Sequence, residues 1–481
     1  MRDRQRWPTF LVLAAGMALR VALAVVTPPE RSYDDHFEPV RVILKEGRIP
    51  TAADCWECYQ PPLYYLVSAG LCAVTQPLAA ALTGSSESWE HVGRRTLQFT
   101  SVFAGGATLW VCWLILRRFQ PRESHAALAL ALPAFLPAHL HMSAMATNDA
   151  LTYLLAALAI YAALRAHDAG WPTRGCVTTG LLAGLTTFSK GYGWATVLAI
   201  ALATWRFTRQ PEDHREPRLP HEIARSLRLI LIAALPLGIW PVAVNLWTYG
   251  KLHIDNFTMW PETPMRYQPP GSVTGTSFLS FRFADLLRHP WLHVAHVDSF
   301  WTQFYARLWF DYEGFNTTLA PYPPWQRLWE RSATTYPEWN RQRWEILLGY
   351  GPNEVPPHFR RIAVISYVAG LPLSLCVLGG LLVALRKASG TFPIALLTIH
   401  FTFAAAVPLI HTLRLPHFAA MKTAFALSGL ATAAVLIHLV PDRVGPRTLR
   451  VVVLGTSWLA TAAIAAADVA FVLFQARQTW P

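Results

Sequence analysis

The chain has 481 residues, of which 53% are hydrophobic and only 15% are charged, and its formal net charge is +12. A soluble protein of this size carries about a quarter charged residues, so the composition excludes an ordinary soluble protein and indicates a polytopic membrane protein. The basic residues flank apolar runs and form no stripe with interleaved aromatic residues, which excludes a nucleic-acid-binding protein.

The first apolar segment covers residues 7–27. It is too long for the core of a signal peptide, and no small-x-small cleavage site follows it, so we interpret it as a retained membrane anchor. Arg2, Arg4 and Arg6 precede it, which predicts a cytoplasmic N-terminus. Arg20 lies inside this segment, and we expect its charge to face protein rather than lipid.

Residues 61–83 are also apolar but contain three prolines. If they crossed the membrane, the next span (96–116) would end outside at a cluster of arginines, whereas short basic loops belong inside. We therefore place 61–83 at the outer interface. The later spans then alternate, and we expect them at 126–142, 150–164, as a short pair within 176–207, and at 229–247, 362–385, 391–411, 423–440 and 451–474.

This reading predicts an all-α polytopic protein, a bundle of about eleven transmembrane helices with juxtamembrane helices on the periplasmic face. We divide the chain into a transmembrane core, 1–248, with a first external loop at 28–93. A long periplasmic loop region, 249–360, and C-terminal transmembrane helices, 361–481, complete it. The sequence shows no strong internal repeat, which argues against a transporter built from inverted repeats.

The external loop contains a C-x-x-C motif, Cys55 and Cys58. A metal site would require two more ligands at suitable spacing, and none lies nearby. A local disulfide in an oxidising compartment and a pair of free thiols both remain open. Cys112, Cys176 and Cys376 lie in or near apolar spans, and we interpret them as packing residues.

On this topology, polar side chains from separate segments converge on the outer face of the membrane. They are Asp34, Asp35, His36, Glu57, Gln60, His139, His141, Asn148, Asp149, Lys190, Arg414, His417 and Lys422. Carboxylates can take protons from hydroxyl groups, and lysine and arginine can hold a phosphate. This set suits transfer from a lipid-linked phosphate donor, in which a carboxylate activates the acceptor hydroxyl and cations stabilise the departing phosphate.

Each of these residues has a structural alternative. Asp149 stands at a helix start and fits an N-terminal cap role. Lys190 fits a side chain that snorkels to the surface, Arg414 and Lys422 fit ordinary loop charges, and the histidines fit hydrogen-bonded structural residues. The adjacent acids Asp34 and Asp35 are the strongest signal, because like charges repel and their burial beside a bilayer is costly.

The order of these motifs resembles the GT-C superfamily of integral-membrane glycosyltransferases, in particular the bacterial protein mannosyltransferase and lipid A aminoarabinose transferase group (glycosyltransferase family 39). The matching pieces are Asp34-Asp35, GRIP at 47–50, QPPLYY at 60–65, TNDAL at 147–151 and GLTTFSKG at 184–191. They cover about the first 210 residues in order. Relatives often have Asp-Glu where this chain has Asp34-Asp35, and a charged residue where it has Gln60.

The resemblance implies a polyprenyl-phosphate-sugar donor, inversion at the sugar carbon and a lipid, glycan or protein acceptor reached from the periplasmic side of the inner membrane. It implies that Asp34 is the catalytic base, with Asp35 as helper. Lys190 matches a residue lining the donor site, with Arg414 and Lys422 as further phosphate contacts. His36, Gln60, Asn148 and Asp149 are expected to support the acceptor or the site. Acceptor recognition is expected from residues 249–360.

No cofactor is required by this chemistry, but a divalent metal is compatible with the hard oxygen ligands of Asp34, Asp35 and Asp149. Two other classes of function remain open. A polytopic transporter or lipid flippase would place charged residues along a path through the middle of the bilayer, whereas most acids here lie at its outer edge. A catalytically silent scaffold would use the same fold.

Overall fold

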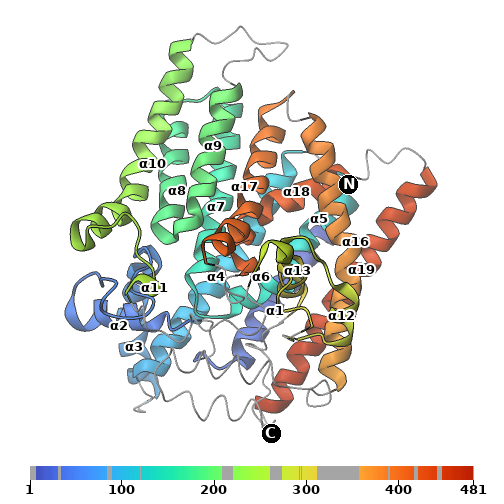
Figure 1. The fold of residues 1–481 in the computed structure, drawn as a ribbon, viewed down its shortest axis with the longest axis horizontal. Helices are drawn as coiled ribbons and strands as arrows, with labels where there is room; N and C mark the ends of the chain where they lie inside the picture. Colours follow the sequence, from blue (N-terminus) through green and yellow to red (C-terminus); the bar gives the residue numbers. More distant parts are fainter. Residues whose placement is uncertain are drawn as a thin grey trace.

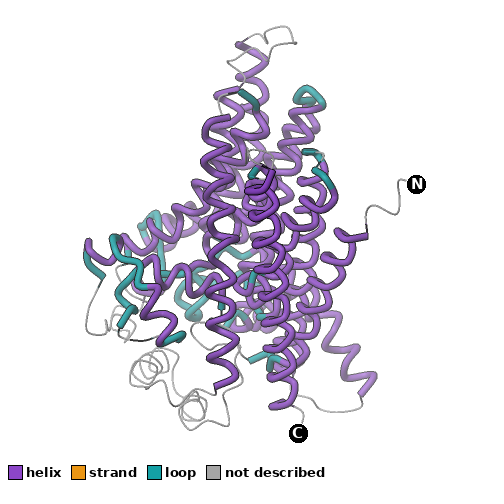
Figure 2. The backbone as a smooth tube through the Cα atoms, turned by 90° about the vertical axis from the view of Figure 1, so that its right-hand side faces the viewer, coloured by secondary structure: helices purple, strands orange, loops and turns teal. Residues whose placement is uncertain are grey.

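The computed structural model describes residues 7–30, 34–83, 89–119, 121–207, 220–259, 273–291, 293, 295–310, 357–387, 390–415, 421–440 and 447–479. Within these ranges the secondary structure is helical, without strands, as predicted for an all-α membrane protein. The long helices run roughly alongside one another, and the described loops gather mainly near one end (Figures 1 and 2). The chain is therefore a multi-pass membrane protein.

Among the described residues, eight helices are long and apolar enough to cross a membrane. They are α1 (Trp7–Val26), α3 (Leu63–Thr83), α4 (Trp89–Arg117), α7 (Asn148–Asp168), α10 (Pro220–Tyr249), α16 (Pro357–Lys387), α17 (Phe392–Arg414) and α19 (Arg447–Thr479). The shorter apolar helices are α8 (Thr173–Ser189), α9 (Trp194–Phe207) and α18 (Leu430–Leu439), the last preceded by the 3-10 turn η7 (Thr423–Gly429). Each span predicted from the sequence has a helical counterpart.

The predicted span 126–142 is a broken helix rather than a straight one. α5 (Glu123–Phe135) and α6 (Pro137–Ala144) meet at an angle of 50°. Pro137 has no N–H to donate to the carbonyl of Pro133, and Leu136 before it takes an extended ψ of 113°, as residues before proline prefer. Two carbonyl groups inside the protein therefore need another donor.

Arg20 of α1 supplies that donor. Its guanidinium donates to the carbonyl oxygens of Pro133 (2.8 Å) and Ala134 (3.0 Å), and it also lies 2.6 Å from Nδ1 of His139. The side chain is fully buried, so the prediction that this charge faces protein is confirmed. Arg20 thus connects α1 to the break between α5 and α6.

Two helices precede α4 at the end of the bundle where α1 stops. α2 (Phe37–Glu46) ends at Gly47, whose φ of 66° favours glycine, and whose N–H donates to the carbonyl of Ile43. In α3, Gln76 donates to the carbonyl of Trp89, at the start of α4, and Arg95 of α4 donates to the carbonyl of Ala24, at the end of α1. Length and composition would let α3 cross a membrane, so its interfacial position remains a prediction.

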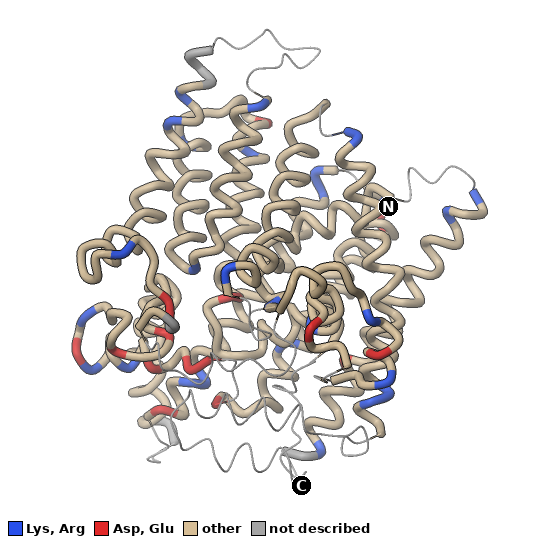
Figure 3. The backbone as a smooth tube through the Cα atoms, viewed as in Figure 1, with Lys and Arg blue, Asp and Glu red and all other residues tan. Residues whose placement is uncertain are grey.

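Charged residues are distributed unevenly along the bundle. In Figure 3 the upper ends of the helices carry mainly lysine and arginine, whereas most acidic residues lie in the lower half, many of them near α2 and α3. The lower end is the end that contains the loop after α1 and the start of α7. This asymmetry is the one expected if the upper end faces the cytoplasm.

The long segment after α10 is described in two parts, 249–259 and 273–310 with gaps at 292 and 294. It contains α11 (Asn256–Met259), the 3-10 turn η4 (Gly275–Phe278), α12 (Phe283–Arg288) and α13 (Phe300–Trp309). α13 packs against α16 and η7. Residues 311–356 of the predicted periplasmic region lie outside the described residues, and the three-part division of the chain remains a prediction.

Acid should loosen this segment near His296. His296 is buried, its Nε2 donates to the carbonyl of His289 (2.8 Å), and burial lowers its pKa to about 4; the carbonyl and Asp285 oppose this shift, while His293 and His289 add to it. At pH values between about 4 and the usual histidine pKa of 6.5, His296 binds a proton only when the segment is open. The stability of the closed segment therefore decreases as the pH is lowered. Hydrogen exchange should show that the free energy of local opening is about 2 kcal/mol lower at pH 5 than at pH 7.

The control for this prediction is His296→Gln, because the amide of glutamine can still donate to the carbonyl of His289 but does not titrate. Hydrogen-exchange protection of residues 283–303 should then depend much less on pH over the same interval, with the remaining dependence due to His293. An unchanged pH dependence in His296→Gln would assign the effect to another group.

Candidate active site

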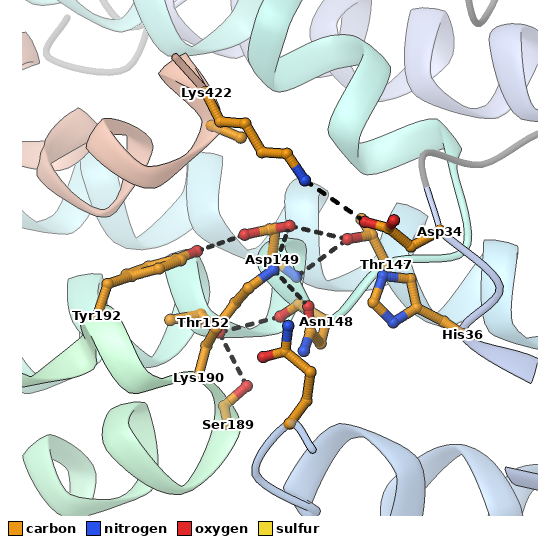
Figure 4. A network of polar contacts seen from close by, with 12 residues as sticks. Asp34, His36, Thr147, Asn148, Asp149, Thr152, Ser189, Lys190, Tyr192 and Lys422 are labelled. Atoms are coloured by element: carbon orange, nitrogen blue, oxygen red, sulfur yellow. Dashed lines mark hydrogen bonds and ion pairs between the residues drawn. The ribbon is translucent and has the colours of Figure 1, made fainter. Parts of the chain in front are cut away.

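Four separate stretches of chain meet at the lower end of the bundle. They are the loop after α1, the start of α7, the junction of α8 and α9, and the residues before η7 (Figure 4). Gln98 of α4 helps to align two of them, since its amide donates to the carbonyl of Thr27 after α1 (3.2 Å) and to that of Ala144 at the end of α6 (2.8 Å). Side chains that are distant in sequence therefore share one cluster.

The first part of the cluster is an ion pair between Lys190 and Asp149. Lys190 follows the last turn of α8, and its Nζ lies 2.7 Å from Oδ2 of Asp149 and 2.7 Å from Oδ1 of Asn148. The other carboxylate oxygen of Asp149 accepts a hydrogen bond from Tyr192 (2.7 Å). Asn148, Asp149 and Lys190 are all buried, so the alternative that Lys190 snorkels to the surface is wrong.

Thr147 provides the cap at the start of α7. Its hydroxyl oxygen accepts a hydrogen bond from the N–H of Asp149 (3.3 Å) and itself donates to the Asp149 carboxylate (3.0 Å). Thr147 therefore takes the capping role that the sequence allowed for Asp149, whose oxygens instead contact Lys190 and Tyr192. Removing either Lys190 or Asp149 would leave the other charge buried without its partner, which is costly.

The second part is formed by Asp34, Lys422 and two neighbours. Nζ of Lys422 lies 3.6 Å from Oδ2 of Asp34, whose side chain is 16% exposed. One ligand atom each from Asp34, His36 and Glu57 lies within 4.8 Å of the others. Asp34 thus stands between a cation and two groups that can hold or move protons, and a small part of it stays accessible.

His36 is held in its neutral form. Its Nδ1 lies 3.0 Å from the hydroxyl of Tyr65, whose ring stacks on the imidazole. Burial, reinforced by the positive charge of Lys190, lowers the pKa of His36 to about 4, although Asp34 and Asp149 oppose the shift. A neutral imidazole in contact with a tyrosine hydroxyl can accept a proton or bind a cation.

Glu57 is the buried acid of the cluster, with 2% of its surface exposed. Burial raises its pKa well above the usual range, and the nearby Asp34 carboxylate adds to the shift, against Lys190, Lys422 and the hydrogen bond from Gln60. The amide of Gln60 donates to Glu57 (3.2 Å) and to the hydroxyl of Tyr59 (2.7 Å). The sequence placed Glu57 on this face without giving it a role.

Asp35 is engaged differently from its neighbour Asp34. Its two carboxylate oxygens accept hydrogen bonds from Arg94 of α4, at 2.6 and 2.7 Å, and one of them also accepts from the N–H of Phe37 at the start of α2. A bidentate pair of this kind fixes geometry. Asp35 therefore connects the loop after α1 to α4 and supports the position of Asp34.

Arg414, predicted to contact phosphate, forms an ion pair with Asp255 (3.1 Å) that joins the end of α17 to the segment after α10. Although burial opposes it, hydrogen bonds from His253 and Thr258 and the charge of Arg414 keep the pKa of Asp255 well below its usual range. Asp255 also acts electrostatically on Tyr59 near Glu57. Sequence reasoning missed Asp255, because nothing in its local pattern marks it.

Two predicted histidines lie elsewhere. His139 contacts Arg20 at the break between α5 and α6, and the ring of His141 lies beside the ring of Phe471 of α19. They belong to the interior of the bundle, as the structural alternative for histidines anticipated. Tyr192, whose only sequence signal is its place in Lys-Gly-Tyr-Gly after α8, is an addition to the site. His417 lies outside the described residues.

The chain was compared with known protein families and with curated proteins. Residues 76–240 match the family of dolichyl-phosphate-mannose-protein mannosyltransferases. No curated protein matches the chain.

Among solved structures, the fold is similar to the apo oligosaccharyltransferase of Archaeoglobus fulgidus, with a TM-score of 0.51 and 13% identity over 98% of this chain. The chain spans 57% of that protein's length. ArnT from Cupriavidus metallidurans, bound to undecaprenyl phosphate, matches more weakly, with a TM-score of 0.37 and 15% identity over 91% of this chain and 81% of its own. The family match and the shared fold confirm the resemblance of this chain to the GT-C superfamily of integral-membrane glycosyltransferases.

Proposed function

We propose that this protein is a membrane glycosyltransferase that moves a sugar from a polyprenyl-phosphate-linked donor to an acceptor hydroxyl. The observation that supports this most is the position of Asp34, a partly accessible carboxylate 3.6 Å from Lys422 and in one cluster with Lys190. A base and phosphate-binding cations in a single site are the groups that such a transfer needs.

In the proposed reaction, Asp34 takes the proton of the acceptor hydroxyl as its oxygen attacks the anomeric carbon. The bond from that carbon to the donor phosphate oxygen breaks, and the lipid phosphate leaves with the bonding electrons. Because attack and departure occur on opposite faces, the anomeric configuration inverts. Lys422, Lys190 and Arg414 are the proposed contacts of the leaving phosphate. Asp35 acts through its pair with Arg94, which orients Asp34.

Each of the three proposed phosphate contacts already has a carboxylate partner. Lys422 pairs with Asp34, Lys190 with Asp149, and Arg414 with Asp255. A donor phosphate must therefore share or displace these partners. In particular, a phosphate that attracts Lys422 would leave Asp34 a stronger base, because a neighbouring cation stabilises the ionised carboxylate and weakens its proton affinity. Donor binding would then prepare the base for the acceptor.

For a divalent cation, we propose a different set of ligands from the one expected from the sequence. The sequence pointed to Asp34, Asp35 and Asp149, but Asp35 is engaged by Arg94 and Asp149 by Lys190. Asp34, His36 and Glu57 instead bring two oxygen ligands and one nitrogen ligand together, a mixed set that suits Mn²⁺ or Zn²⁺. Such an ion would supply positive charge for the leaving phosphate. Transfer measured with and without a chelator tests the requirement.

We place the site on the external, periplasmic face of the inner membrane. Most acidic residues of the described chain lie in the half of the bundle that carries the site, whereas the opposite ends of the helices carry mainly lysine and arginine (Figure 3). The segment 249–360 is the proposed acceptor-binding region, because its described part packs beside η7, next to Lys422. The acceptor is a lipid, glycan or protein hydroxyl.

The function is tested by radiolabelled sugar transfer from synthetic polyprenyl-phosphate donors in proteoliposomes. We expect transfer that depends on donor and acceptor together. Movement of the intact donor lipid across the bilayer without transfer would support a flippase instead. Absence of both activities, across donors carrying different sugars, would favour a scaffold and contradict the proposal.

Donor binding should depend on Lys190. Lys190→Gln alone leaves Asp149 buried without its cation, so we compare the double variant Lys190→Gln/Asp149→Asn, which keeps the site neutral and able to form hydrogen bonds. We expect this variant to fold but to raise the donor KM by on the order of tenfold, since a charge-assisted contact of about 1.4 kcal/mol is lost. An unchanged donor KM would remove Lys190 from the phosphate site.

A further inference from the structure

The first external loop contains a disulfide whose place in the chain is unusual. Cys55 and Cys58 are bonded to each other, which resolves the alternative left open by the sequence, and Glu57 is one of the two residues enclosed between them. Both sulfurs belong to buried residues, with 8% and 4% of their surface exposed. The only residues in the bonded ring are Cys55, Trp56, Glu57 and Cys58.

We propose that this disulfide is a redox-sensitive positioning element that holds the Glu57 carboxylate against Asp34 and His36. Its effect on sugar transfer rests on the function proposed above, whereas its effect on the position of Glu57 does not. The site is therefore complete only while Cys55 and Cys58 are bonded, and reduction of this bond releases the carboxylate of Glu57.

The position of Glu57 requires such a restraint. A carboxyl group beside another carboxylate and away from water is in an unfavourable environment, because burial and like charge both act against its ionised form. Glu57 is 2% exposed and close to Asp34, and among the described residues its carboxylate accepts one hydrogen bond, from the Gln60 amide at 3.2 Å. In a flexible loop, rotation into solvent would relieve this cost.

The surrounding backbone restrains the loop only locally. The N–H of Cys58 donates to the carbonyl of Cys55 (3.2 Å), and the N–H of Gln60 donates to the backbone carbonyl of Glu57 (3.1 Å). Both are hydrogen bonds within turns. Before the ring, Asp54 accepts two hydrogen bonds from Arg48. After it, the chain enters α3. The disulfide closes the remaining stretch, where Glu57 itself lies, and limits the conformations from which its side chain can leave.

Reduction by dithiothreitol provides the test. Two electrons and two protons pass from the reagent's two thiols to the S–S bond, which gives the Cys55 and Cys58 thiols and the cyclic disulfide of the reagent. Thiol labelling after denaturation verifies each state. Four proteins are compared: the unmodified chain, Cys55→Ser/Cys58→Ser, Glu57→Gln, and Cys376→Ser as a control cysteine distant from the loop.

The first readout does not depend on activity. A glutamate-specific protease should cut after Glu57 in the reduced protein and in Cys55→Ser/Cys58→Ser, but not in the oxidised protein or in Cys376→Ser. The exposed Glu46 serves as the internal reference, since it is accessible in both states. Equal protection of Glu57 after verified reduction would overturn the proposal, whatever the protein catalyses.

The second readout is sugar transfer. Reduction should lower kcat by roughly tenfold to a hundredfold, as expected when the proposed base Asp34 loses a neighbouring group that helps to position it, and reoxidation should restore it. The donor KM should change little, because Lys190 and Arg414 lie on other segments. Reduction should have no further effect on Cys55→Ser/Cys58→Ser or on Glu57→Gln. Full activity of the reduced, unmodified protein would contradict a role of the disulfide in catalysis.

Mn²⁺ binding, followed by electron paramagnetic resonance, adds a third comparison. If Glu57 contributes to a cation site with Asp34 and His36, reduction should weaken Mn²⁺ binding to the level of Glu57→Gln. Binding that is strong in the oxidised chain and unchanged on reduction would show that the disulfide does not position this acid.

Discussion

Replacing Asp34 with asparagine is expected to reduce sugar transfer by on the order of 10²–10⁴-fold, the usual contribution of a positioned general base. Asparagine keeps the size of the side chain but cannot take a proton from the acceptor. The contact with Lys422 is partly exposed, so its loss should cost little stability. We therefore expect normal membrane insertion and a normal melting temperature, measured together with the transfer rate.

The matched control is Glu30→Gln. Glu30 also follows α1, but its carboxylate is half exposed and pairs with His91 rather than with the site. The same chemical change there should leave transfer unchanged. Asp35→Asn is the informative comparison, because its loss of the Arg94 pair should lower both stability and transfer. Full transfer by Asp34→Asn would reject Asp34 as the base.

The Arg20→Ala substitution is expected to lower the free energy of unfolding by about 3–5 kcal/mol, because it removes a buried cation from the interior of the bundle. The carbonyl of Ala134 would lose its donor inside the bundle, the carbonyl of Pro133 would keep only Nδ1 of His139 at 2.9 Å, and a void would replace a fully buried side chain. The break leads through α6 to Asn148 and Asp149. Thermal unfolding in detergent and yield of monodisperse protein measure the effect.

Arg117→Ala is the control, because Arg117 is exposed at the end of α4, where it lies over the ring of Trp113. Its loss should cost less than about 1 kcal/mol. A second test uses Pro137→Ala, which restores an N–H able to donate to Pro133. In the Arg20→Ala background this change should recover part of the stability. Additive losses in the double variant would show that Arg20 does not act through these carbonyls.

The membrane spans are the part of the fold that sequence reasoning predicted best. Long apolar runs and flanking arginines are local properties of the chain, and each predicted span became a helix. The shape of 126–142 was not predicted, although Pro137 marked the break. The interfacial position of 61–83 remains a prediction from charge balance, whereas length and hydropathy alone would let this helix cross the membrane.

The candidate site was predicted as a group but not as a set of contacts. Asp34, His36, Asn148, Asp149, Lys190 and Lys422 do lie together (Figure 4). Their partners were not predictable, because several cations and several carboxylates of equal chemistry reach the same face. Asp35 contacts Arg94 instead of serving the site directly, and Arg414 contacts Asp255. The roles assigned to these residues remain proposals.

The amino-acid sequence by itself determined that the chain is an all-α membrane protein, which apolar segments form its long helices, and which polar segments face the same side. These follow from hydrophobicity, proline and charge bias within single segments. Only the tertiary structure decided which carboxylate meets which cation, that Glu57 is buried between Cys55 and Cys58, and that Arg20 reaches the carbonyls of α5. Those contacts depend on distances between helices, which are set by packing across the whole bundle rather than by any local pattern.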